Sequence, residues 1–211
     1  MVGLSIVTMA PAVFRPSQRT RSLAFAAARF VKSLRHVSWQ VYERSLHPVR
    51  HLAVRRRLSN AKRPRRILVL CYGNVCRSPY LQAALLREFA GAQVISAGFI
   101  GSGRPVPPIA LELGRQRGVD LSAHRSRRVT PDLVRDADLV LVMDAELRRR
   151  VAVSFSVKSD KIVIAPDLAA NFVDGRMIKD PVNQPVDAFI STFDHLDACV
   201  ATLVAVFNKT A

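Results

Sequence analysis

From residue 66 onward, short apolar segments alternate with segments of helical pattern, and this alternation limits the possible folds more than any other feature. Four segments read as buried strands: residues 66–72, 92–98, 138–144 and 161–167. Five read as helices: residues 78–91, 107–118, 130–137, 145–155 and 186–207. Strands that are apolar along their whole length and separated by helices are typical of parallel sheets covered on both faces. We therefore predict an α/β fold with a four-stranded parallel sheet and helices on both of its faces.

The positive charge of the chain is concentrated before this alternating region. The formal net charge is +16 over 211 residues. Residues 1–66 hold 15 Lys and Arg against one acidic residue, whereas residues 67–211 hold 17 against 15. We therefore predict two parts: a basic N-terminal extension at residues 1–65 and a single domain at residues 66–211.

Two of the three cysteines, Cys71 and Cys76, lie in one short phrase, CYGNVCRSP, directly after the first apolar strand. Three cysteines cannot form a paired disulfide framework, and closely spaced cysteines outside such frameworks are more often catalytic or metal-binding. No second pair of Cys or His accompanies these two, so the spacing does not favour a metal site. Ligands of parallel sheets bind beyond the carboxyl ends of the strands, which is where this phrase lies.

The phrase has the composition of an anion-binding loop. Backbone N–H groups of a strand-to-helix loop converge on an anion, with the N-terminus of the helix behind them. Gly73 permits a positive φ or a close approach, and Asn74 tolerates the left-handed conformation better than most residues. Arg77 adds a planar fork that suits two phosphate oxygens. A thiol at Cys71 would face this positive field, which favours the thiolate and nucleophilic attack on a phosphoryl group.

The string C-x-G-N-x-C-R-S-P after a buried strand resembles the phosphate-binding loop of the low-molecular-weight protein tyrosine phosphatase family, and the resemblance covers about residues 66–207. It implies a phosphomonoester hydrolase that dephosphorylates phosphotyrosine in proteins through a cysteinyl-phosphate intermediate, without metal or other cofactor. Cys71 would be the nucleophile, and Arg77 would bind the phosphoryl oxygens. The loop residues implied in substrate binding are Tyr72, Gly73, Asn74, Val75, Cys76 and Ser78.

The family also needs an Asp-Pro pair near the C-terminus, whose Asp protonates the leaving oxygen. Asp180 and Pro181 supply that pair, and proline holds the residue before it in an extended conformation. The resemblance further implies that Ser96 hydrogen-bonds Asn74 and that His124, in the segment AHRSR, joins the same network.

Two more roles follow from the resemblance alone. The hydroxyl of Ser78 would contact the nucleophilic sulfur and stabilise it as a leaving group. Cys76 would lie close enough to Cys71 to form a reversible disulfide under oxidants. Cys199, on the last predicted helix, is expected to be a core residue.

The sequence departs from the family pattern in ways that leave alternatives open. Many members carry an aromatic residue directly after Asp-Pro, where this chain has Val182; Tyr72 is a candidate for a ring on the other side of the mouth. Related protein-arginine phosphatases carry threonine where this chain has Val75. Related arsenate reductases need further cysteines, and none lies between Cys76 and Cys199. A protein-arginine phosphatase or a non-catalytic phosphoprotein-binding module remains an alternative function.

Residues 23–44 of the basic segment fit an amphipathic helix, with Val41 on the apolar side and Glu43 opposite. With the arginines that follow, residues 23–57 are expected to contact an anionic membrane surface or a partner protein; an organelle transit peptide and a solvated tail are the alternatives. No recognition motif accompanies the charge, so no specific nucleic acid is predicted as a partner. The expected location is the cytoplasm, with the membrane as a peripheral site.

Overall fold

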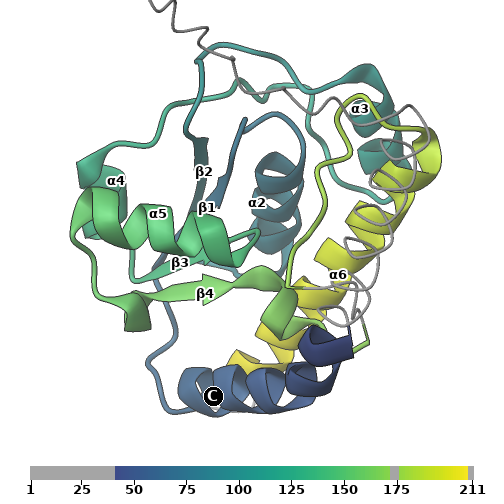
Figure 1. Cartoon of the computed structure of the whole chain (residues 1–211). Helices are drawn as coiled ribbons and strands as arrows, with labels where there is room; N and C mark the ends of the chain where they lie inside the picture. The colour runs from purple at the N-terminus through teal and green to yellow at the C-terminus, as the bar shows by residue number, and fades with distance from the viewer. Residues whose placement is uncertain (1–40, 172–175, 209–211) are drawn as a thin grey trace, which may run out of the picture. The chain divides into compact units, whose positions relative to one another are not determined.

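The computed structural model describes residues 41–171 and 176–208, and within them the alternating region forms one sheet of four parallel strands (Figure 1). The strands are β1 (Arg66–Cys71), β2 (Gln93–Gly98), β3 (Leu139–Val142) and β4 (Ile162–Ile164). They lie in the order β2-β1-β3-β4, and Cys71 at the end of β1 is in register with Gly98 at the end of β2. The predicted parallel α/β sheet is confirmed.

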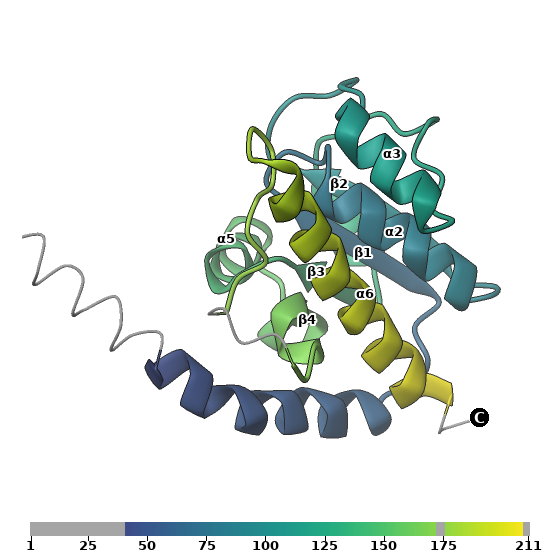
Figure 2. The same ribbon diagram turned by 90° about the vertical axis from the view of Figure 1, so that its right-hand side faces the viewer.

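Helices cover both faces of the sheet. Figures 1 and 2 show α2 (Arg77–Glu88), α3 (Pro108–Gln116) and α6 (Val186–Asn208) on one side of the sheet and α4 (Pro131–Asp136) and α5 (Ala145–Phe155) on the other. The predicted helix at residues 145–155 has the bounds of α5, and the other predicted helices differ from the observed ones only at their ends. Thr130 caps α4, because its hydroxyl accepts a hydrogen bond from the N–H of Leu133 at 3.4 Å.

The last predicted strand, at residues 161–167, is longer than the observed one. β4 ends at Ile164, and Ala165–Leu168 form a turn of 3₁₀ helix. Pro166 explains the difference, since it lacks the N–H that a continuing ladder would need. A further 3₁₀ turn, Ser159–Lys161, leads into β4.

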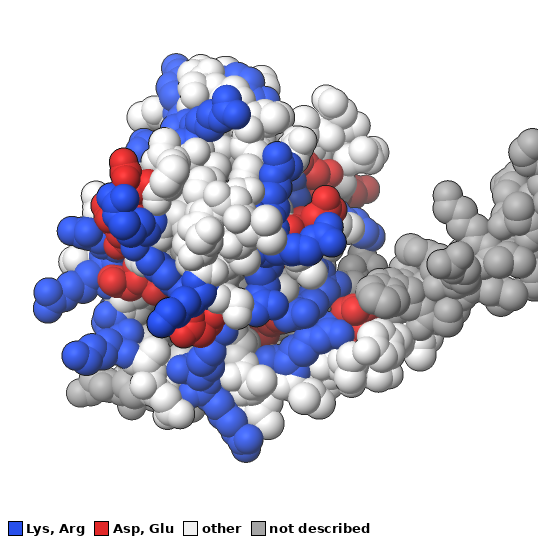
Figure 3. Space-filling view, turned by 60° about the vertical axis from the view of Figure 1, so that its left-hand side comes forward, with Lys and Arg blue, Asp and Glu red and all other residues white. Residues whose placement is uncertain are grey.

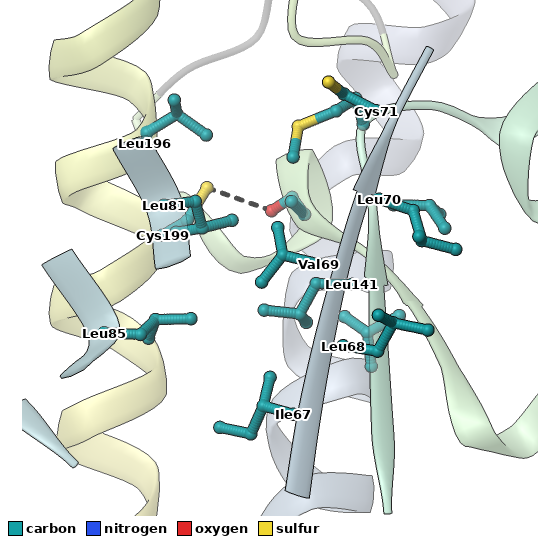
Figure 4. Close-up of a cluster of buried hydrophobic side chains, with 14 of the residues drawn as sticks. Ile67, Leu68, Val69, Leu70, Cys71, Leu81, Leu85, Leu141, Leu196 and Cys199 are labelled. Atoms are coloured by element: carbon teal, nitrogen blue, oxygen red, sulfur yellow. Dashed lines mark hydrogen bonds between the residues drawn. The ribbon is translucent and has the colours of Figure 1, made fainter. Parts of the chain in front are cut away.

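The core lies on both faces of the sheet, and Figure 4 shows Ile67 and Val69 of β1 on the side of α6 and Leu68 and Leu70 on the other side. Cys199 of α6 is buried, and its thiol donates a hydrogen bond to the carbonyl of Ala165 at 3.1 Å, so this cysteine is the core residue that the sequence predicts. By length and composition alone α6 could cross a membrane, but half of its apolar stretch is buried inside the domain, as in the core helix of a globular fold.

A helix also covers residues 41–59, before the first strand. Residues 42–59 belong with the sheet to one compact unit that begins at Tyr42. His47 is hydrogen-bonded through Nε2 to the carbonyl of Ala169 at 2.7 Å, and the side chain of Leu58 is buried in the core. The sequence assigns this helix to the extension, whereas in the structure it packs against the domain.

Most of the amphipathic pattern predicted for residues 23–44 lies outside the described residues, which begin at 41. At its described end, the side of the helix that is buried carries Glu43 and not the apolar Val41. Val41 is 59% exposed, whereas Glu43 is 6% exposed and forms an ion pair with Arg50. The carboxylate is buried because Glu43 lies on the side of the helix that docks on the domain, and the arginine satisfies its charge there.

Candidate active site

The loop at residues 71–78, called the phosphate loop below, connects β1 directly to the first turn of α2. No side chain caps the N-terminus of α2 at Cys76. Pro79 in the first turn has no N–H to satisfy, and the remaining orphan N–H groups of that turn face the loop that precedes the helix. A strand end and a helix N-terminus therefore form the backbone cradle that the sequence predicts at this position.

Cys71 lies at the start of this cradle, with its side chain buried. Its Sγ is 3.0 Å from the hydroxyl oxygen of Ser78, and it accepts a hydrogen bond from the backbone N–H of Asn74 at 3.1 Å. The contact between Ser78 and the sulfur is the one that the resemblance implies. Two polar groups thus fix the position of the sulfur within the loop.

Asn74 organises the loop from its centre. Its φ is +52°, the left-handed conformation expected of it, and its side chain is fully buried. Its Nδ2 donates to the hydroxyls of Ser78 and Ser96, both at 2.9 Å, and its Oδ1 accepts from the backbone N–H of Arg127 at 2.8 Å. Its carbonyl is hydrogen-bonded to Nε2 of His124 at 2.9 Å. Both contacts that the resemblance implies for Asn74, with Ser96 and with His124, are therefore present.

The glycine that the loop requires is not the one that the sequence analysis singled out. Gly73 has no positive φ, and a Cβ there would make only an ordinary contact of 3.5 Å with the side chain of Arg104. A Cβ on Gly98 of β2 would lie 2.8 Å from the carbonyl of Tyr72 and 2.9 Å from the backbone nitrogen of Asn74. The backbone approach that excludes a side chain is therefore at Gly98.

Arg77 joins the phosphate loop to the segment that carries the predicted acid. Its guanidinium is buried, donates to the carbonyl of Ile178 at 2.9 Å and forms an ion pair with Asp180. Its Nε is buried and has no hydrogen-bond partner among the residues that the structure describes. The segment itself is anchored to the end of β3, because the N–H of Ile178 donates to the carbonyl of Met143 at 2.9 Å. Asp180 accepts a further hydrogen bond from the N–H of Val182 at 3.3 Å, and its side chain is 46% exposed.

Two arginines without a predicted role, Arg150 and Arg104, contact residues of the phosphate loop. Tyr72 is 46% exposed, and the guanidinium of Arg150 lies 5.5 Å from the centre of its ring and 4.5 Å from that of Phe99. Arg104 donates to the carbonyl of Gly73 at 2.5 Å. Neither arginine belongs to a motif, and only the folded chain brings them to the loop. The sequence gives no signal for them.

Two titratable groups beside the nucleophile have shifted pKa values. Burial raises the pKa of the Cys76 thiol, and the nearby Cys71 and Asp180 act in the same direction, against the opposing effect of Arg77. Cys76 is therefore held as a neutral thiol. Burial also lowers the pKa of His124, partly offset by its hydrogen bond to Asn74. The neutral imidazole is thus the form that suits this position.

Asp144, at the end of β3, has a structural role. Its carboxylate accepts a hydrogen bond from the N–H of Leu147 at 2.6 Å and caps α5. A second side chain that the sequence does not single out supports the network around Asn74: Gln82 of α2 accepts a hydrogen bond from the hydroxyl of Ser96 at 2.6 Å.

Comparisons with known proteins agree with this geometry. Residues 66–211 match the family described as low molecular weight phosphotyrosine protein phosphatase. The probable low molecular weight protein-tyrosine-phosphatase EpsP of Ralstonia solanacearum is 39% identical over 125 residues, which are 58% of this chain and 82% of that protein. The tyrosine phosphatase AmsI of Erwinia amylovora superimposes with a TM-score of 0.64 at 27% identity, over 69% of this chain and 95% of that one. The YwlE arginine phosphatase of Geobacillus stearothermophilus superimposes with a TM-score of 0.62 at 27% identity, over 69% and 94%. With the family match spanning both the phosphate loop and the acid segment, the chain belongs to the low-molecular-weight protein tyrosine phosphatase family.

Proposed function

We propose that the protein hydrolyses phosphotyrosine in protein substrates, with Cys71 as nucleophile, Arg77 as the phosphoryl-binding residue and Asp180 as general acid. The observation that carries the proposal is the ion pair between Arg77 and Asp180. This contact supports the proposal, because it joins Asp180 to Arg77 of the phosphate loop although 102 residues lie between the two in the sequence. A nucleophile, an anion cradle and a proton donor then surround one point in space.

In the first step the Cys71 sulfur attacks phosphorus as the bond from phosphorus to the tyrosine oxygen breaks. Asp180 gives its proton to that oxygen, so tyrosine leaves as a neutral phenol. Arg77 and the loop N–H groups bind the non-bridging oxygens, whose charge must be stabilised in the transition state. The product of this step is a cysteinyl-phosphate.

In the second step water attacks the phosphorus of that intermediate, and the Asp180 carboxylate takes the proton of the water. The bond from sulfur to phosphorus breaks, and the thiolate of Cys71 is the leaving group. The Ser78 hydroxyl at 3.0 Å and the Asn74 N–H at 3.1 Å from Sγ are positioned to stabilise the charge that returns to sulfur.

Tyrosine is favoured over arginine as the dephosphorylated residue for three reasons. Relatives such as EpsP and AmsI are named as tyrosine phosphatases. Val75 stands where protein-arginine phosphatases carry threonine, and the half-exposed ring of Tyr72 provides a surface on which a phenyl ring can pack. We expect kcat/KM for a phosphotyrosine peptide to exceed that for the matching phosphoarginine peptide by at least about tenfold, since each factor of ten needs only about 1.4 kcal/mol. The reverse order would assign the arginine activity instead.

The direct test of the activity is the release of phenol from phenyl phosphate by the full chain, under reductant and without added metal. Wild type is compared with Cys71→Ser and Asp180→Ala, with circular dichroism as the control for folding. We expect no turnover with Cys71→Ser and strongly reduced turnover with Asp180→Ala. A folded, reduced wild-type protein that binds phosphopeptides but releases no phosphate would support the binding-module alternative and overturn the enzyme.

We also propose that the protein acts in the cytoplasm and that residues 23–57 bring it to an anionic membrane surface. The deletion that tests this ends at residue 40, because residues 42–59 pack on the domain. It should abolish sedimentation with phosphatidylglycerol vesicles and leave phenyl phosphate hydrolysis intact. Unchanged sedimentation would contradict a membrane role of residues 23–40 without bearing on the phosphatase.

A further inference from the structure

A second basic pocket lies where the helix at residues 41–59 meets β4 and α5. Its volume is about 210 Å³, and it shares no lining residue with the phosphate loop or with Asp180. Four of the residues that line it are arginines, and one is acidic: Arg50, Arg57, Arg148, Arg176 and Asp167. Figure 3 shows the wider setting, a face on which Lys and Arg side chains gather with acidic side chains between them.

Two of these arginines have their charge balanced. Arg50 forms an ion pair with Glu43. Arg176 makes three hydrogen bonds of 2.6 to 3.1 Å to the carboxylate of Asp167. These pairs fix the position of both guanidinium groups and leave the pocket with the charge of the other two arginines.

The other two arginines, Arg57 and Arg148, have no carboxylate within ion-pair distance among residues 41–171 and 176–208. Arg57 donates to the carbonyl of Ile162 at 3.4 Å, a long hydrogen bond that leaves most of its donors unused. Burial lowers the pKa of Arg57, and the charge of Arg148 is the next largest cause, ahead of the opposing effects of Asp160 and Asp167. Two guanidinium groups therefore repel each other across a partly desolvated pocket.

The walls of the pocket are held by specific contacts. His47 and His51 of the helix are hydrogen-bonded to the carbonyls of Ala169 and Asp167, at 2.7 and 3.1 Å. Arg57 reaches the pocket from the same helix, which precedes the residues that match the phosphatase family. The pocket thus exists because this helix docks on the domain.

We propose that this pocket binds a phosphate-bearing anion, held chiefly by Arg57 and Arg148. A planar guanidinium binds two phosphate oxygens at once, and a dianion would turn the repulsion between the two arginines into attraction to a common ligand. The pocket volume of about 210 Å³ is many times the space that one water molecule needs, so the pocket can admit a group larger than water. The site is distinct from the catalytic cradle, where backbone N–H groups rather than paired arginines surround the anion.

The test uses calorimetric titration of inorganic pyrophosphate into the full chain carrying Arg77→Gln, which removes the main anion-binding side chain of the phosphate loop. We expect this variant to retain one binding event. Adding Arg57→Gln and Arg148→Gln should weaken that event at least tenfold. The matched control adds Arg56→Gln and Arg149→Gln, which are exposed neighbours on the same two helices and remove the same charge, and it should bind within about twofold.

Absence of binding in the Arg77→Gln protein, or equal weakening by both pairs of substitutions, would overturn the proposal. Circular dichroism checks that each variant is folded. If Arg77→Gln does not fold, the same pairs are compared in the wild-type background, where loss of one of two binding events on substitution of Arg57 and Arg148 is the expected result. Retention of both events would again contradict the site.

The phosphate group could belong to a soluble molecule or to a lipid headgroup, and sedimentation with phosphatidylcholine vesicles containing phosphatidic acid distinguishes these sources. A lipid headgroup is indicated if Arg57→Gln and Arg148→Gln decrease sedimentation, the control pair does not, and pyrophosphate releases the protein from the vesicles. Pyrophosphate binding without that decrease indicates a soluble ligand. Because all these readouts are independent of turnover, they would stand or fall separately from the phosphatase activity.

Discussion

The phosphate loop and the segment that carries Asp180 meet at one site, but they are held there very differently. Asn74 of the loop is fully buried and hydrogen-bonded through its side chain to three other residues. Asp180 is half-exposed, and its carboxylate contacts one backbone N–H and the guanidinium of Arg77. Several buried hydrogen bonds thus fix the conformation of the cradle, whereas only a few contacts at the surface hold the side chain of Asp180.

This difference fits the two roles in the mechanism, which are stabilisation of the transition state by the loop and proton transfer by Asp180. Electrostatic stabilisation of a transition state needs donors that are fixed before the substrate arrives. A general acid that must regain its proton in each turnover needs access to solvent. Substitutions in the loop should therefore change stability, and substitutions at the acid should change catalysis while leaving stability almost unaltered.

The largest expected effect belongs to Asp180→Asn. It should lower kcat/KM for phenyl phosphate, which reports the step in which the phenol leaves, by about 10²- to 10⁴-fold, the usual range for a general acid. The loss should be much smaller for p-nitrophenyl phosphate, whose leaving group needs little help from a proton. Steady-state kinetics with both esters, together with the unfolding midpoint, measure this. Equal losses for the two esters would mean that Asp180 does not act as the acid.

Asn74→Ala should have the largest effect on stability. It removes buried hydrogen bonds and puts alanine, which tolerates the left-handed region less well than asparagine, at this position, so the free energy of unfolding should fall by about 2–4 kcal/mol. Asn74→Gly keeps the backbone conformation and should lose only the part due to the side chain. Denaturant unfolding of both variants separates the contribution of the side chain from that of the backbone conformation. A loss below about 1 kcal/mol for the alanine variant would contradict the claim that Asn74 fixes the cradle.

The two glycines sharpen the same comparison. Gly98→Ala places a Cβ within 2.9 Å of loop backbone atoms and should cost about 1–3 kcal/mol of unfolding free energy, as overpacking does. Gly73→Ala adds only ordinary contacts and should cost less than about 0.5 kcal/mol. Thermal or denaturant unfolding of this pair measures the difference. An equal cost at both positions would show that the close approach is not at Gly98.

The smallest effect is a pH dependence through His124. Because its pKa is lowered in the folded state, the unfolded chain binds a proton more readily between that lowered value and the ordinary pKa of about 6.5. The free energy of unfolding should therefore rise with pH through this window and become independent of His124 above it. His124→Gln should flatten that rise. Denaturant unfolding at about pH 5.5 and about pH 7.5 tests this, and an unchanged slope would contradict it.

The phosphate loop could be predicted from the sequence because its chemistry is local. Cys71, Asn74, Arg77 and Ser78 lie within one strand-to-helix connection, so their spacing alone brings them together. The pairing of Asp180 with the loop was accessible only through family resemblance, since no local pattern joins residues so far apart.

The contacts that the sequence missed all depend on tertiary packing. Gly98 must be glycine because β2 lies beside the loop backbone, and Arg150 reaches Tyr72 only because α5 packs near the end of β1. The burial of Glu43 was not predicted, because the helical wheel shows which residues share a side, not which side docks. The second basic pocket likewise combines residues from four separate segments of the chain.

The most direct test of the central claim is to trap the covalent intermediate. The full chain carrying Asp180→Asn is mixed with p-nitrophenyl phosphate, whose leaving group needs little help from a proton, and is then quenched with acid and mapped by mass spectrometry. Loss of the residue that activates water should let the intermediate accumulate. The account predicts one phosphoryl group on Cys71 and none in the protein that also carries Cys71→Ala. A phosphoryl group on another residue, or continued turnover by the protein without Cys71, would contradict it.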